Sequence, residues 1–200
     1  MPIVYLIETN NQTVLSQGIR LFSRYPYNHL SIALDASLSE VYSFGRRQPI
    51  NPLMAGFAKE DFSHSFYKES SGRVYAIQVS DQEWQVIHTH LQSFELNPFD
   101  WHYNLLGLLP AYFQYSWERP DHFFCSEFVA TLLQSAGVLS PYNRPNLMHP
   151  RDVIESVHPI CVYDGQLQLY PGLIQSISSP HPSERRSFRP IRYVYRQFIH

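Results

Sequence analysis

The stretch Asp121–Gly137, DHFFCSEFVATLLQSAG, decides the fold prediction, because it joins an amphipathic helix to a cysteine near the start of that helix. Apolar residues recur at three- and four-residue spacing over Phe128–Ala136, which predicts a buried helical stripe. Gly137 is suited to end the helix, since glycine adopts the left-handed backbone conformation without steric cost. We therefore expect a buried helix with Cys125 in, or just before, its first turn.

A cysteine at this position has two interpretations. The unpaired N–H groups and the positive dipole end at a helix start favour a negative charge, so a basic neighbour can lower a thiol pKa from about 8.5 to about 3.5–7.5. A free cysteine is also often a small buried residue without a chemical role. Cys125 alone does not decide between these interpretations. Cys161, at the start of an apolar run, is interpreted as structural.

Composition narrows the class of protein. The chain has 200 residues, enough for one domain with a full core. A formal charge of −2 gives no electrostatic reason to expect nucleic acid or an anionic membrane surface as a partner. Two cysteines are too few for a disulfide framework, and the N-terminal MPIVYLIETNNQ does not resemble a secretory signal. No apolar run is long enough to span a membrane, so a cytoplasmic protein is expected.

The N-terminal part of the chain predicts strands and one helix. Ile3–Ile7 is a continuous apolar run, typical of a buried strand, and Thr13–Ser23 has helical spacing after a capping threonine. His29–Asp35 alternates between apolar residues and a face of small and polar ones. A second strand, Glu40–Gly45, is expected to pair antiparallel with it. The polar face beside His29 is either the floor of a cleft or an ordinary surface.

The middle of the chain is less regular. Arg46–Gly72 contains several prolines, glycines and serines, so we expect loops that form a lid over a site. Val74–Val79 predicts a strand. Asp81–Leu96 predicts a helix capped by Ser80, with a glutamate three residues on to complete the capping box. Tyr103–Phe113 predicts an apolar helix broken by a proline.

Four features are expected nearer the C-terminus. His149–Val157 predicts a short helix with proline in its first turn. Asp164-Gly165 lies between two apolar runs, which predicts a β-hairpin. Ser176–Pro190 is rich in serine and proline and is expected to be loose and exposed, while Ile191–Ile199 alternates weakly, as an edge strand does.

A cysteine–histidine site needs a thiol at a helix start and an imidazole held on a strand, and Cys125 and His29 are each expected on such an element. The imidazole takes the thiol proton, the thiolate attacks an acyl carbon, and N–H groups at the helix start stabilise the oxyanion. A third polar group normally orients the imidazole. Ten histidines allow many chance pairings, so spacing alone does not establish that these two residues meet. No zinc-ligand spacing is found, and no metal or cofactor is predicted.

Five blocks in order carry a resemblance to a known family: YPYNHLSIALD, VYSFGR, NPLMAGF, YNLLGLL and FFCSEFVATLL. Together they resemble the circularly permuted branch of the NlpC/P60 superfamily of papain-like cysteine hydrolases, in which the histidine strand precedes the cysteine helix. The resemblance covers roughly Ile3–Val157. It implies an α+β, papain-like domain with a small antiparallel sheet packed against helices. Residues 1–200 are then one domain, with a C-terminal hairpin and loose tail at 158–200.

The resemblance also implies roles for individual residues. Cys125 corresponds to the nucleophile and His29 to the general base. Alignment of VYSFG puts the third polar position on Ser43, with Glu40 as its competitor on the opposite face of the same strand. Many relatives carry histidine or glutamate there, so a serine departs from the family pattern.

Three functions are open at this point. The first is a cysteine hydrolase, a peptidase or amidase that cleaves an amide in a small peptide through a thioester intermediate. The second is an acyltransferase or thioesterase that acts on lipid acyl groups, which fits an aromatic content of 15%. The third is a binding module that keeps the fold without catalysis. The partner expected for the first two is a small peptide or acyl substrate.

Overall fold

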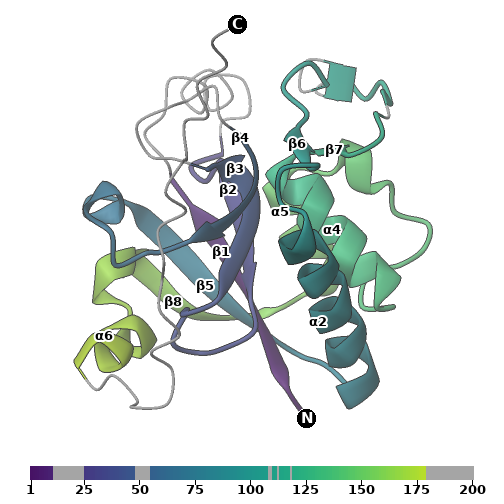
Figure 1. Cartoon of the computed structure of the whole chain (residues 1–200). Helices are drawn as coiled ribbons and strands as arrows, with labels where there is room; N and C mark the ends of the chain where they lie inside the picture. The colour runs from purple at the N-terminus through teal and green to yellow at the C-terminus, as the bar shows by residue number, and fades with distance from the viewer. Residues whose placement is uncertain (11–24, 48–54, 108–109, 112, 118, 179–200) are drawn as a thin grey trace, which may run out of the picture.

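The computed structural model describes residues 1–10, 25–47, 55–107, 110–111, 113–117 and 119–178. This part of the chain is an α+β protein built on one eight-stranded sheet with the order β7-β6-β4-β3-β2-β1-β5-β8 (Figure 1). The strands are β1 Ile3–Thr9, β2 His29–Ala33, β3 Val41–Arg46, β4 Ala55–Glu60, β5 Ser71–Gln78, β6 His102–Tyr103, β7 His122–Phe123 and β8 Ile160–Gln166. Neighbouring strands run antiparallel, except that β6 and β7 are parallel.

Helices cover both faces of this sheet. The described α-helices are α2 Asp81–Leu96, α4 Cys125–Ser135, α5 Pro150–Val157 and α6 Pro171–Ser178. Short 3-10 helices lie at η1 Ser65–Tyr67, η2 Pro145–Leu147 and η3 Leu167–Leu169. Figure 1 shows α2, α4 and α5 on one side of the sheet and α6 on the other. Within the described ranges, no helix is long and apolar enough to cross a membrane.

Two main hydrophobic cores follow from this arrangement, beside a small third cluster of Ala111, Phe124 and Leu147. We call the side where Leu6, Leu30 and Ile32 pack against α2, α4 and α5 the α4 face. The side where Ile7 and Ala33 pack against η3 and α6 is the α6 face. Because side chains alternate along a strand, neighbouring residues of β1 and β2 contribute to opposite cores.

Helix α4 lies at the centre of the larger core, as its sequence predicted. Cys125 is its first residue, and Phe128, Leu132 and Leu133 are buried against the sheet. Phe128 also packs in an aromatic cluster, with its ring centroid 5.0 Å from that of Phe44. The helix ends as expected, since Gly137 has a left-handed φ of +82° that a side chain would disfavour.

Several other sequence predictions are confirmed. The strands expected at Ile3–Ile7, Glu40–Gly45 and Val74–Val79 correspond to β1, β3 and β5, and β2 pairs antiparallel with β3. Helix α2 has the predicted capping box: Ser80 Oγ accepts from the Glu83 N–H, and the Glu83 carboxylate accepts from the Ser80 N–H. The short helix after His149 is α5.

The prediction that Arg46–Gly72 forms irregular loops is wrong for much of that segment. Residues 55–60 form β4, which pairs with β3 over six positions, from Val41↔Glu60 to Arg46↔Ala55. The sequence AGFAKE gives little apolar alternation, so its strand structure follows from pairing with β3 and from Phe57 in the larger core. Residues 48–54 lie outside the described part of the chain.

Two further predictions differ from the structure. Asp164-Gly165 is not a hairpin turn, because β8 continues through it and pairs with β5 at Arg73↔Asp164 and Gly72↔Gly165. The Arg73 guanidinium donates to Asp164 Oδ2 over 2.8 Å, which favours this pairing over a local turn. Over Tyr103–Phe113, the described residues form the end of β6, a turn at 105–107 and only a short helical segment at 110–111.

The helix predicted at Thr13–Ser23 and the strand predicted at Ile191–Ile199 lie outside the described residues. The segment Ser176–Pro190, predicted to be loose, begins within α6 instead, and its part from residue 179 onward is also outside.

Candidate active site

The start of α4 presents the Cys125 sulfur to backbone donors. Cys125 is 6% exposed, and the residue before it, Phe124, has an extended backbone that turns the chain into the helix. The Glu127 carboxylate accepts a hydrogen bond of 3.1 Å from the Phe124 N–H, which satisfies one of the N–H groups at the helix start. The N–H of Ser126 donates to the Cys125 sulfur.

A second backbone donor to the sulfur comes from the part of β2 that is not paired with β3. Strands β2 and β3 are paired at Ile32↔Tyr42 and Ala33↔Val41, and this pairing does not continue toward the start of β2. The N–H of Leu30, in the unpaired part of β2, donates to the Cys125 sulfur. The sulfur is therefore close to the part of β2 where the pairing with β3 has ended.

His29 joins the thiol to a carboxylate. Its imidazole is hydrogen-bonded to Cys125, and its Nε2 lies 2.7 Å from Oε1 of Glu60. Because Glu60 occupies Nε2, the nitrogen that remains for the thiol is Nδ1. His29 is 7% exposed, so this contact is shielded from solvent on the side of Glu60.

Glu60 is the centre of a buried polar cluster. Ser31 Oγ donates to its Oε2 over 2.6 Å, and Ser43 Oγ donates to its Oε1 over 2.9 Å. The Tyr67 hydroxyl is a third donor to the carboxylate. Alternation along β2 and β3 puts both serines on the α6 face, whereas α4 packs on the other face. The site is therefore assembled across the opening between β2 and β3.

The charges of the three groups stabilise one another. Burial raises the pKa of Cys125, but the hydrogen bond and charge of His29 and the two backbone donors bring it below its ordinary value of 9.0. Burial lowers the pKa of His29, but Glu60 and Cys125 raise it well above 6.5. Burial also raises the pKa of Glu60, but the charge and hydrogen bond of His29 and the hydroxyls of Ser31 and Ser43 bring it below 4.5. These directions favour a thiolate–imidazolium–carboxylate arrangement.

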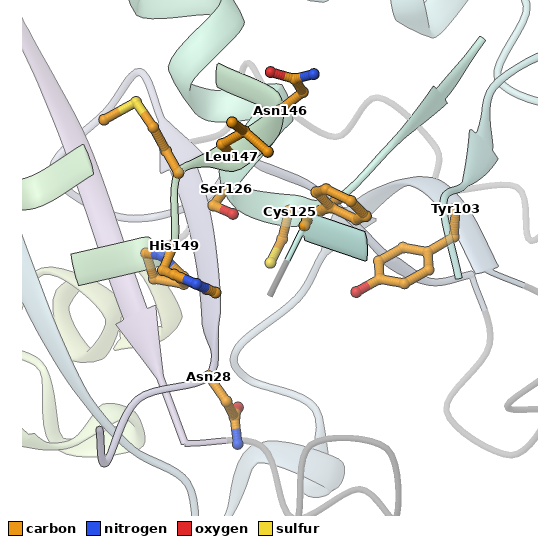
Figure 2. Close-up of a pocket in the computed structure, with 11 residues that line it drawn as sticks. Asn28, Tyr103, Cys125, Ser126, Asn146, Leu147 and His149 are labelled. Carbon is orange, nitrogen blue, oxygen red and sulfur yellow. The ribbon is translucent and has the colours of Figure 1, made fainter. Parts of the chain in front are cut away.

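The sulfur of Cys125 faces a small pocket. Figure 2 shows the sulfur pointing into a space between Tyr103, Asn28 and His149. The pocket is lined by Asn28, Tyr103, Ala111, Phe124, Cys125, Ser126, Asn146, Leu147, Met148, His149 and Pro150. Its volume is about 50 Å³, room for a few atoms around the sulfur rather than for a whole substrate.

The Tyr103 hydroxyl lies on the same side of the pocket as the Cys125 sulfur. Its ring lies across from Cys125 with the oxygen directed toward the space that the sulfur faces (Figure 2). Burial, and to a smaller extent the charge of Cys125, raise the pKa of Tyr103. The hydroxyl therefore stays protonated and is available as a hydrogen-bond donor. It is carried by β6, whose partner β7 leads directly into α4.

The structure brings Cys125 and His29 together, but it gives different positions to the two residues proposed for the third role. Ser43 donates to Glu60 and does not bond His29. Glu40 lies at the surface, where its carboxylate is 3.1 Å from the Lys59 ammonium. The group that contacts the imidazole is Glu60, which the sequence does not indicate, because it lies in a segment whose composition is typical of loops.

His149 was expected only at the start of the short helix that ends at Val157, and the structure gives it a second position as well. It does cap α5, where its N–H donates to Asp152 Oδ2 over 2.8 Å, but it lines the pocket as well. Cys161 is exposed and lies on β8, away from the pocket residues. No three His, Cys, Asp or Glu side chains in the described part of the chain are grouped so that they could hold a metal ion.

No protein-family model matches the chain, and neither a curated protein nor a solved structure matches it. The function is therefore inferred from the geometry of the site.

Proposed function

We propose that the protein is a cysteine hydrolase that acts through a thioester intermediate on Cys125. The observation that carries this proposal is the continuous buried contact from Cys125 through His29 to Glu60. A thiol held at a helix start, an imidazole on its sulfur and a carboxylate behind the imidazole are the three parts that nucleophilic catalysis by cysteine requires.

The chemistry follows from the positions of these groups. The Cys125 thiolate attacks the substrate carbonyl carbon, and a carbon–sulfur bond forms. The His29 imidazolium gives its proton to the leaving amine or alcohol as the bond to that group breaks. The neutral imidazole then takes a proton from water, the hydroxide attacks the thioester, and the acid leaves as the thiolate is restored.

The developing oxyanion needs hydrogen-bond donors close to the sulfur. We assign this role to the Tyr103 hydroxyl, which faces the same space, and to the N–H groups at the start of α4. Glu60 stays ionised and fixes the orientation of His29, and Ser31 and Ser43 hold Glu60 in place. We therefore assign the third role to Glu60 rather than to Ser43 or Glu40.

The papain-like character of the fold is part of the same proposal. The histidine strand β2 comes before the cysteine helix α4 in the chain, as the resemblance to the permuted NlpC/P60 branch implies. That resemblance, and with it the choice between peptide amides and lipid acyl groups, stays a prediction. The cytoplasmic location likewise stays a prediction from composition.

The proposal is tested by the pH dependence of alkylation by iodoacetamide. The experiment uses Cys161→Ser as its background, because Cys161 is exposed and would react as well. We expect Cys125 to react well below the ordinary thiol pKa, and His29→Ala to move the profile upward. His90→Ala, on the outer part of α2, is the matched histidine control and should leave the profile unchanged.

Two results would contradict the proposal. Identical profiles for the background and His29→Ala would mean that the imidazole does not activate the thiol. A thiol that reacts only above about pH 8 in the background protein would support the alternative of a silent binding module. Hydrolysis of p-nitrophenyl acetate, with acetylated Cys125 found by mass spectrometry and lost in Cys125→Ala, is the direct positive result.

A further inference from the structure

The segment between β6 and β7 exposes an unusual group of large side chains. Leu105, Leu106, Phe113, Tyr115 and Trp117 are 46–71% exposed, and we call these five residues the apolar lip. Figure 1 shows the β6–β7 segment at one end of the molecule, beyond α2. Elsewhere, exposed apolar side chains occur singly or in pairs, such as Ile160 and Val162 on β8, and are ordinary surface residues.

The apolar lip is continuous with the wall of the candidate active site. Tyr103 lies two residues before Leu105, and Ala111 lies two residues before Phe113. Both Tyr103 and Ala111 line the pocket. The Asn146 side chain, also in the pocket wall, donates to Ser116 Oγ within the segment. A substrate whose reacting carbonyl lies at Cys125 would therefore extend over the lip, since the pocket itself is small.

Several backbone N–H groups in the described part of the segment are bonded within its own turns. The Leu105 N–H donates to the Tyr103 carbonyl, the Phe113 and Tyr115 N–H groups donate to the Pro110 carbonyl, and the Gly107 N–H donates to the Asn104 carbonyl. A partner therefore meets side chains rather than a strand edge that could add a peptide strand. Internal satisfaction of N–H and C=O groups is also what an apolar environment demands of a backbone.

The charge of the segment points to an uncharged partner. From Trp101 to Trp117 the sequence contains no Asp, Glu, Lys or Arg. Tyrosine and tryptophan combine an apolar ring with a polar tip, which suits the boundary between lipid and water. A basic patch would be expected for an anionic membrane, and the chain carries a formal charge of −2.

We propose that the apolar lip docks on a neutral lipid–water interface and that the substrates of Cys125 are long-chain acyl esters or amides. The substrate part of this inference rests on the function proposed above. The acyl chain lies on the lip while its carbonyl carbon binds the Cys125 sulfur. The bond to the alcohol or amine headgroup then breaks, and the headgroup leaves with the proton from His29.

Co-sedimentation with phosphatidylcholine vesicles tests the docking surface. The full chain should bind them, and binding should change little between low and high salt, because apolar contacts drive it. The double variant Leu106→Gln/Phe113→Gln should bind about 100-fold more weakly, since burial of each such side chain is worth at least about tenfold in partition. Ile160→Gln/Leu169→Gln, two exposed apolar residues on β8 and η3, is the matched control and should bind normally.

Hydrolysis of two p-nitrophenyl esters separates docking from catalysis. Neither lip residue of the double variant lines the pocket, so it should hydrolyse p-nitrophenyl acetate like the wild type and lose activity on the laurate ester presented in vesicles. A wild type that binds vesicles but cleaves neither ester contradicts the function proposed above and the acyl substrate, and leaves the docking surface supported.

Three results would overturn the docking surface: no vesicle binding by the wild type, equal losses in the lip and control variants, or concentration-dependent self-association that only the lip variant loses. The last would identify a second copy of the chain as the occupant. Equal laurate hydrolysis by wild type and lip variant would overturn the acyl-chain assignment alone.

Discussion

Two buried carboxylates lie on opposite faces of the same sheet, and their pKa values shift in opposite directions. Glu8 on β1 accepts hydrogen bonds of 2.9 and 3.0 Å from the Tyr25 hydroxyl, and one of 3.0 Å from the Tyr75 hydroxyl. Glu60 on β4 accepts from serine and tyrosine hydroxyls in much the same way. Burial raises the pKa of Glu8 despite its donors, whereas the pKa of Glu60 is lowered.

The two carboxylates differ in whether a cation is paired with them directly. Glu60 faces the His29 imidazolium at 2.7 Å, and the two charges outweigh the cost of burial. The cation that acts on Glu8 is Arg73, whose guanidinium is paired with Asp164 over 2.8 Å. Hydroxyl donors alone therefore do not hold a buried carboxylate ionised as firmly as an opposite charge does. The comparison identifies Glu60, and not Glu8, as part of the candidate site.

The largest effect on activity is expected when the charge of Glu60 is removed. Glu60→Gln removes the charge that stabilises the His29 imidazolium, so we expect kcat/KM for p-nitrophenyl acetate to fall by roughly 10²- to 10⁴-fold. The pH profile of Cys125 alkylation should move upward with it. Glu8→Gln is the matched control and should keep both properties. Equal losses in the two variants would contradict the distinction between the carboxylates.

Crowding the imidazole should have a smaller effect. A Cβ at position 45 would lie 3.2 Å from Cε1 of His29 and 3.5 Å from Ser43 Oγ. Gly45→Ala therefore displaces the ring by a few tenths of an ångström, and we expect about a tenfold loss of kcat/KM. Urea unfolding of the same variant should show no matching loss of stability. An unchanged alkylation rate at pH 7 would mean that the position of the ring is not critical.

Removing one hydrogen-bond donor to Glu60 should reduce activity less than crowding the imidazole does. Ser43→Ala leaves the carboxylate with Ser31, Tyr67 and His29, so we expect about a threefold loss of activity and about 1–2 kcal/mol of stability. Glu40→Ala removes a surface pair with Lys59 and should change stability by less than about 1 kcal/mol, with activity unchanged. Activity and urea unfolding are measured on both variants. A larger activity loss in Glu40→Ala would return the third role to that residue.

The smallest effect on activity, and a distinct effect on stability, is expected for Glu8→Gln. The pKa of Glu8 is raised in the folded protein above its ordinary 4.5, so between these two values the folded state binds more protons than the unfolded chain. Wild-type stability from this group therefore falls as pH rises above 4.5 and is constant once the folded pKa is passed.

The amide of Glu8→Gln does not titrate, which gives this prediction a direct measurement. Urea unfolding of wild type and variant from pH 4 to pH 7 should show the variant gaining free energy of unfolding relative to the wild type as pH rises. A constant difference across this range would mean that burial does not penalise the Glu8 carboxylate.

The sequence alone determined the elements that carry the thiol and the imidazole. The periodicity after Phe128 and the glycine at 137 define α4, and the alternation after His29 defines β2. These signals are local, since a helix or strand that buries one face repeats its apolar residues at a fixed spacing. The Ser80 capping box of α2 was predictable for the same reason.

Only the tertiary structure decided which groups surround the imidazole. Glu60 lies on a short strand without clear alternation, and it reaches His29 because β4 pairs with β3 and β3 diverges from β2. The exposure of Leu105 and Phe113 was also not predictable, since the sequence of an apolar run does not show whether its side chains are buried or exposed. Pairing and exposure depend on residues far away in the chain, and the local sequence does not record them.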